Sequence, residues 1–127
     1  MTLAGGLRPI IASWDDIPVE EVYPGINRQI QSGSLLDMVR YRYEPGSVFP
    51  EHSHPQEQIT VVVSGLIRFK IGETIVDLGP GNVAVIPTNT PHGAEVIDDH
   101  PVETFNAFSP RRSMMPARDN ASKRSDE

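Results

Sequence analysis

Residues 46–65 read GSVFPEHSHPQEQITVVVSG, and this stretch decides the fold. Its second half is rich in Val and Ile and ends at a glycine, the composition of a β-strand closed by a turn. His52 and His54 are two positions apart, so on an extended chain both imidazoles point to one face. The same alternation continues through Gln58 and places Glu57 on the opposite face. The stretch therefore predicts two imidazoles and a carboxamide that converge.

The rest of the chain has the same strand-and-turn character. Twelve prolines and ten glycines divide 127 residues into short apolar runs, which predicts an all-β, antiparallel sandwich or small barrel. The only expected helix is a short turn capped by Ser13 and stopped by Pro18. The eight expected strands are residues 28–30, 35–43, 58–64, 66–71, 74–78, 83–86, 94–97 and 102–108.

A third histidine stands where it could complete a metal site. His92 follows the turn 87–91, at the start of an expected strand, and can approach the other two from elsewhere in the chain. The chain has no cysteine, which excludes thiolate ligands and disulfides. Imidazole, carboxylate and amide groups are the possible ligands. His100 lies in the loop 98–101 and is expected to be a solvated turn residue.

These positions resemble the two motifs of the cupin superfamily. The first motif, G-x5-H-x-H-x3-E-x6-G, is reproduced with Gln in place of Glu, at Gly46, His52, His54, Gln58 and Gly65. The second is reproduced in part, at Gly81, Pro87 and His92, with Asn89 and Val96 departing from the pattern. The resemblance covers residues 35–110 and has the short motif spacing of small monocupins. It implies a cupin-type antiparallel β-barrel, or jelly roll.

The same resemblance implies one divalent metal ion on His52, His54, Gln58 and His92. Three neutral imidazoles and a neutral amide leave the ion its full charge, which strengthens a Lewis acid and disfavours redox chemistry with dioxygen. We expect zinc first, with nickel, manganese or ferrous iron as alternatives.

Residues 105–112, FNAFSPRR, resemble the D-x-F-S-P-x-R stretch of cupins that linearise unsaturated uronates from pectin and alginate. In that family the Asp, Phe and Arg line the active site, and they correspond here to Asn106, Phe108 and Arg112. Asn106 and Arg112 are therefore the candidate catalytic residues. Asn106 departs from the pattern, because an amide cannot act as the general base that a carboxylate provides.

The remaining candidates define the expected substrate. Thr60, Val62, Phe108 and either Met38 or Val39, with Met38 preferred, are expected to line a largely apolar pocket, which suits a flat apolar carbonyl compound. The leading hypothesis is therefore a metal-dependent cyclase of aromatic polyketides, whose motifs and size this chain resembles. The alternatives are a uronate-opening isomerase and a cupin that binds a ligand without turning it over.

The sequence also predicts the partners, the location and the domain organisation of the protein. The net charge of −6 opposes nucleic acid binding, and no stretch suggests a signal peptide or a membrane span, so a cytoplasmic protein is expected. Residues 1–34 should pack on the barrel (35–110) or on a partner subunit, and residues 111–127 should be a disordered tail. Ile59, Val61 and Val63 are apolar on the outer face, which favours a homodimer.

Overall fold

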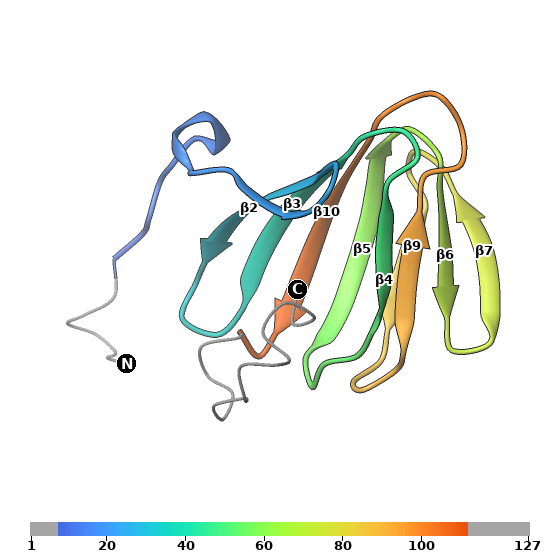
Figure 1. The fold of residues 1–127 in the computed structure, drawn as a ribbon. Helices are drawn as coiled ribbons and strands as arrows, with labels where there is room; N and C mark the ends of the chain where they lie inside the picture. Colours follow the sequence, from blue (N-terminus) through green and yellow to red (C-terminus); the bar gives the residue numbers. More distant parts are fainter. Residues whose placement is uncertain (1–7, 112–127) are drawn as a thin grey trace.

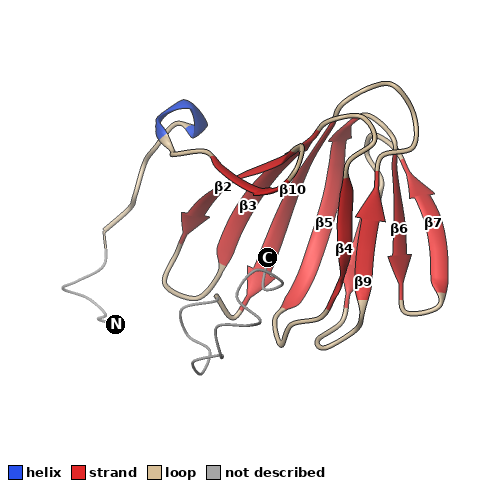
Figure 2. Cartoon of the chain, in the orientation of Figure 1, coloured by secondary structure: helices blue, strands red, loops and turns tan. Residues whose placement is uncertain are grey.

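The computed structural model describes residues 8–111 and shows an antiparallel β-barrel of the jelly-roll kind (Figure 1). Arg112, and the tail expected to be disordered beyond it, lie outside the described residues. Within 8–111 there is one short 3-10 helix, η2 (Trp14–Asp16), and the other elements are strands (Figure 2). The strands are β1 (Glu20–Tyr23), β2 (Ile26–Ser32), β3 (Asp37–Tyr43), β4 (Val48–His52), β5 (Glu57–Ser64), β6 (Ile67–Ile71), β7 (Thr74–Leu78), β8 (Val83–Ile86), β9 (His92–Glu95) and β10 (Val102–Ser109).

All strand pairs are antiparallel and form two sheets. One sheet has the order β1-β2-β3-β10-β5-β8 and the other the order β4-β9-β6-β7. The side chains between them form one core, in which Tyr41 of the larger sheet meets Phe49 of the smaller one with ring centroids 5.6 Å apart. The largest fully buried apolar side chains include Phe108, Ile26, Ile67 and Ile86. The expected all-β fold is confirmed.

The eight expected strands are present, β7 and β8 with the expected ends and the other six with shifted ends, and two further strands were missed. β4 contains Pro50, which argues against a central strand, but β4 is the edge of its sheet, where a missing N–H is tolerated. β1 is mostly polar and exposed because it lies at the edge of the larger sheet. β3 begins at Asp37 instead of residue 35, since the two leucines before it belong to the preceding turn.

Gly65 shows why a glycine closes β5. Its φ of +86° lies in the left-handed region, and a Cβ there would stand 2.4 Å from the carbonyl oxygen of Pro101. A side chain at this position would push apart the β5–β6 turn and the start of β10.

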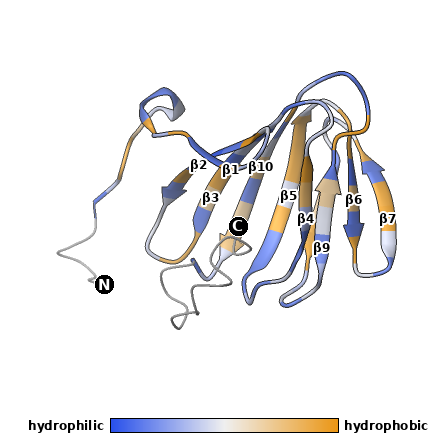
Figure 3. Cartoon of the chain, viewed as in Figure 1, coloured by the Kyte–Doolittle hydropathy of each residue, from blue (hydrophilic) through white to orange (hydrophobic). Residues whose placement is uncertain are grey.

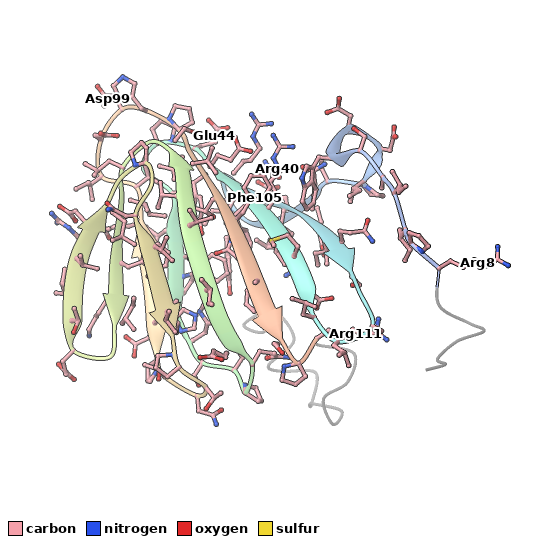
Figure 4. All side chains as sticks on the ribbon, turned by 180° about the vertical axis from the view of Figure 1, so that it is seen from behind. Arg8, Arg40, Glu44, Asp99, Phe105 and Arg111 are labelled. Atoms are coloured by element: carbon pink, nitrogen blue, oxygen red, sulfur yellow. The ribbon has the colours of Figure 1, made fainter. Side chains whose placement is uncertain are left out.

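In the N-terminal segment, the η2 turn packs on the outer face of the larger sheet, whereas β1 and β2 belong to that sheet and residues 8–12 are exposed. Ser13 caps η2 by accepting a hydrogen bond from the Asp15 backbone amide, as expected. The Trp14 ring lies 5.6 Å from that of Phe105, which Figure 4 labels beside Arg40 on this face. The Gln29 amide donates to the carbonyl oxygens of Trp14 and Ile17 at 2.7 and 2.9 Å. No helix in the described part of the chain is long and apolar enough to cross a membrane.

Candidate metal centre

Three histidines meet at one end of the barrel. His52 ends β4 and His92 begins β9, and these two residues face each other as partners across the antiparallel pair. His54 follows in the turn before β5, so it does not lie on one continuous strand with His52 and Gln58 as expected. The chain turns at Pro55, and this turn still brings His54 to the same point. Ligand nitrogens of the three imidazoles lie within 4.8 Å of one another.

Backbone carbonyls fix which ring nitrogen of each histidine faces the centre. The Nδ1 atoms lie 3.0 Å from the carbonyl oxygen of Pro50, 3.0 Å from that of Gln56 and 2.8 Å from that of Thr90, for His52, His54 and His92 in turn. A carbonyl oxygen only accepts, so each Nδ1 carries a proton and each neutral imidazole presents an Nε2 lone pair. Histidine metal ligands typically donate their other ring N–H to a backbone carbonyl or carboxylate in this way.

Burial keeps these imidazoles neutral. Desolvation, together with the neighbouring His92, lowers the pKa of His52 to about 3. Desolvation also lowers the pKa of His92 to about 4, with a contribution from His54. At neutral pH both rings therefore have the deprotonated Nε2 that a metal ion requires.

Gln58 supplies an oxygen to the same point. Its side chain is buried, whereas Glu57 beside it is exposed, which agrees with the choice made from strand alternation. The Gln58 amide nitrogen donates to Thr60 Oγ1 at 2.9 Å, so its oxygen is turned toward His54 Nε2, 3.1 Å away. Both of these atoms present lone pairs, and a cation between them removes their repulsion.

The donor set fits a divalent metal ion. Buried His92 Nε2 has no hydrogen-bond partner, an arrangement that costs free energy unless a ligand satisfies it. Three imidazole nitrogens and one amide oxygen are suitable donors for zinc, nickel, manganese or ferrous iron. His100 is exposed in its loop, hydrogen-bonded through its backbone to Asp98, and is absent from the cluster.

A small aromatic cavity adjoins the cluster. Its volume is about 20 Å³, room for roughly one water molecule. His52, Gln58 and His92 line it together with Gly93 and Ala94. The rest of the lining is aromatic: Tyr41, Tyr43, Phe49, Phe69 and Phe108. Of these five, only Phe108 was predicted from the sequence, although Tyr41 and Tyr43 alternate with Arg40 and Arg42, a pattern that places both tyrosines on one face of their strand.

The other pocket candidates lie elsewhere. Met38 as a pocket residue is wrong: its side chain is 39% exposed on the outer face, because Val39 takes the inward position on β3. Thr60 and Val62 are fully buried and point inward, but the cavity lining does not include them. Thr60 instead contacts Gln58 from behind.

Asn106 also lies behind the ligands and not in the cavity. It is 1% exposed, and its amide nitrogen donates to the Val39 carbonyl oxygen at 3.1 Å and to Thr104 Oγ1 at 2.9 Å. Held in this way, the Asn106 side chain is turned away from the cavity lining, which makes a direct catalytic role difficult. Asn106 and Arg112 as catalytic residues stay predictions, and Arg112 lies outside the described residues.

Gly93 is a residue that the sequence analysis missed. The pairing of β4 with β9 is irregular between Phe49 and His52, and β4 leans over Gly93 at this point. A Cβ on Gly93 would lie 2.9 Å from the Phe49 carbonyl oxygen and 3.1 Å from the Glu51 nitrogen. The absence of a side chain there lets β4 carry His52 close to His92.

Comparisons with known proteins bear on the family and the fold of the chain. A family model described as "Cupin domain" matches residues 39–108. KdgF from Halomonas sp. is 32% identical, with a TM-score of 0.72 over 80% of this chain and 95% of that one. An RmlC-like cupin from Shewanella frigidimarina is 22% identical, with a TM-score of 0.76 over 84% and 96%. The polyketide cyclase RemF from Streptomyces resistomycificus is 15% identical, with a TM-score of 0.72 over 91% and 92%. No curated protein matches the chain.

Proposed function

The chain belongs to the cupin domain family, and from this premise we propose that it is a metal-dependent enzyme that acts on an enolisable carbonyl compound without redox chemistry. One observation carries the proposal. Three imidazole nitrogens within 4.8 Å of one another, and the oxygen of Gln58, converge beside a cavity with an aromatic lining.

The donor set decides the kind of chemistry. When bound, a divalent ion on neutral ligands polarises a carbonyl group and lowers the cost of removing a proton beside it. Four neutral donors compensate a trivalent ion poorly, because none of them is anionic. For this reason zinc is the first candidate and an oxygenase is disfavoured. The aromatic side chains around the cavity exclude water from the reacting carbon.

Cyclisation of an aromatic polyketide is the first candidate reaction. Its support is the cavity, whose lining outside the proposed ligands is uncharged and, apart from Gly93 and Ala94, aromatic in the described part of the chain. Such a lining suits a flat, neutral substrate better than a sugar acid. Because the cavity holds about 20 Å³, only the reacting end of such a substrate enters it without rearrangement.

Ring opening of an unsaturated uronate is the second candidate. It is supported by the resemblance of residues 105–112 to uronate-linearising cupins and by the 32% identity with KdgF. Asn106 weighs against it, since this side chain has no acid–base proton and is turned into the protein interior.

The test combines metal content with turnover. Protein purified without chelator or affinity tag is expected to hold one equivalent of zinc or another divalent metal by elemental analysis. The metal-loaded protein is then offered a poly-β-ketone and a 4,5-unsaturated uronate, with metal-free protein as the control. Turnover of either substrate identifies the reaction. Bound metal with no turnover of any carbonyl substrate would make the protein a ligand-binding cupin, and no metal after reconstitution would refute the proposal.

We further propose a homodimer that buries the outer face of β5 and β8. Ile59, Val63, Val83 and Val85 are 44–59% exposed on this face, and Figure 3 shows the hydrophobic end of β5 in orange. Exposed apolar residues gathered on one sheet face are typical of an interaction surface. The cytoplasmic location stays a prediction.

A further inference from the structure

A chain of buried polar side chains lies behind the proposed metal ligands. Gln58, Thr60, Asn106 and Thr104 are 6%, 0%, 1% and 0% exposed, and they stand on the inner faces of β5 and β10. Asn106 and Thr60 are paired neighbours across these two strands. Interior positions of a barrel are usually apolar, and a buried polar network is retained only when each group is satisfied.

The direction of every hydrogen bond in this chain follows from one backbone carbonyl. The Val39 oxygen can only accept, so the amide nitrogen of Asn106, at 3.1 Å, must face it. The Asn106 oxygen is thereby turned toward Thr60 Oγ1, at 2.6 Å. An amide oxygen also only accepts, so the single hydroxyl proton of Thr60 is used here.

The hydrogen bonds of Thr60 in turn fix the orientation of the Gln58 carboxamide. With its proton committed to Asn106, Thr60 Oγ1 can only accept from Gln58, whose amide nitrogen is 2.9 Å away. The Gln58 nitrogen also lies 3.4 Å from the Asn106 oxygen, so two acceptors face it. The Gln58 oxygen has one direction left, toward His54 Nε2 at 3.1 Å.

We propose that Asn106 and Thr60 are positioning residues that hold the Gln58 carboxamide with its oxygen toward the histidines and thereby specify Gln, and not Glu, as the fourth ligand. The inference rests on the proposed metal centre. A glutamate at position 58 has no amide proton to offer, so its second oxygen and the Asn106 oxygen would compete for the single hydroxyl proton of Thr60, and one of them would be left without a donor. The hydrogen-bonded row of Asn106, Thr60 and Gln58 therefore favours a ligand set in which all four donors are neutral.

The test compares two threonines that both bond Asn106. Thr60→Val removes the acceptor of Gln58, whereas Thr104→Val removes an equally buried hydroxyl on the far side of Asn106 and leaves the Val39 bond in place. Zinc affinity is measured by competition with a chromophoric chelator, and unfolding of the metal-free proteins by urea. We expect Thr60→Val to bind zinc about 10–100-fold more weakly, Thr104→Val within about 3-fold of wild type, and Thr60→Ser to restore binding.

The outcomes separate the two proposals. Equal affinity of Thr60→Val and wild type, or an equal loss in both Val variants, would overturn the positioning role and leave the metal centre standing. Absence of zinc binding in wild type would overturn both. Gln58→Glu adds charge and by itself should tighten binding; we expect no tightening, and a gain of about tenfold or more would overturn the selection of Gln.

One measurement needs neither a variant nor a metal. In the metal-free wild-type protein, the side-chain amide protons of Gln58 should be protected from exchange and show nuclear Overhauser contacts to Thr60. Contacts of these protons to the His54 ring in place of Thr60 would show the amide in the opposite orientation and would overturn the positioning role.

Discussion

At its metal end, strand β5 inverts the usual division of a barrel strand, whereas Val62 further along the strand is apolar and points inward as usual. Its inward side chains at the metal end, Gln58 and Thr60, are polar and at most 6% exposed. Its outward side chains, Ile59 and Val63, are apolar and 44% and 45% exposed. A strand that only had to fold would carry the apolar set inside and the polar set outside.

This difference separates two demands on one strand. The inward polar groups cost desolvation and are retained because they orient a ligand, each with a partner at hydrogen-bond distance. The outward apolar groups are exposed to water in the monomer, which is unfavourable. In the proposed dimer they are retained because a second copy covers them. Substitutions on the inner face should therefore leave dimer formation unchanged, and substitutions on the outer face should leave zinc affinity unchanged.

The largest effect on zinc affinity is expected from His92→Ala, a substitution at the metal end of the barrel interior. Loss of this imidazole removes one of three nitrogen donors, and zinc affinity should fall by more than about 100-fold without unfolding the barrel. Metal content by elemental analysis and affinity by chelator competition measure the change. His100→Ala is the matched control, because that histidine lies in an exposed loop, and it should bind zinc as wild type does. Stoichiometric tight zinc in His92→Ala would remove His92 from the ligand set.

A smaller effect on the same site is expected from Gly93→Ala. The new methyl group would meet the Phe49 carbonyl oxygen at 2.9 Å, so β4 must move away from β9 and take His52 with it. We expect about 1–3 kcal/mol of destabilisation and a roughly tenfold loss of zinc affinity. Urea unfolding and chelator competition measure the two quantities. Gly46→Ala is the control, since no atom lies within 4 Å of its Cβ position and only backbone strain is added. Equal affinity in both variants would show that β4 does not need the close approach.

Much of the fold could be predicted from sequence because turn residues and β-branched runs act locally. The eight expected strands are present, and so is the short helical turn capped by Ser13. β4 was missed because Pro50 is unfavourable in a strand unless it lies at an edge, and edge position is a property of the whole sheet. Strand order likewise depends on long-range pairing that local residues do not encode.

The metal ligands could be predicted because their spacing along the sequence is fixed by the two motifs. The residues around them could not, because their positions depend on three-dimensional packing. His52, His54 and His92 meet within 4.8 Å, as the two motifs indicated. Asn106 was assigned to catalysis because it occupies a catalytic position in related cupins, yet its amide is held by a backbone carbonyl. Met38 was placed inside because alternation alone leaves two choices, and one residue of shift exchanges the faces.

Lowering the pH is expected to have a moderate effect on the stability of the metal-free protein. This effect acts through the buried histidines of the inner face alone. Unfolded histidine has a pKa near 6.5, whereas burial lowers the pKa of His52 to about 3 and that of His92 to about 4 in the folded protein. Between about pH 6.5 and pH 4 the unfolded chain binds more protons, so the stability of the metal-free protein rises with pH. It should fall by roughly 1 kcal/mol per pH unit for each neutral histidine as the pH is lowered. Urea unfolding of the metal-free protein at about pH 7, 6 and 5 measures the slope. His92→Gln should reduce it and His100→Gln should not.

The smallest effect on the metal centre is expected from the outer face, in Val85→Lys. Val85 is 53% exposed on β8 and pairs with Ile59 of β5, so a charge there adds little strain to the monomer but opposes burial against a second copy. We expect a dimer to become a monomer in sedimentation equilibrium, with monomer stability within about 0.5 kcal/mol and zinc affinity unchanged. Ile75→Lys is the matched control, because Ile75 is 64% exposed on β7 of the other sheet. Dissociation by Ile75→Lys and not by Val85→Lys would move the interface to the smaller sheet, whereas loss of zinc in Val85→Lys would show that the two faces of the larger sheet are not independent.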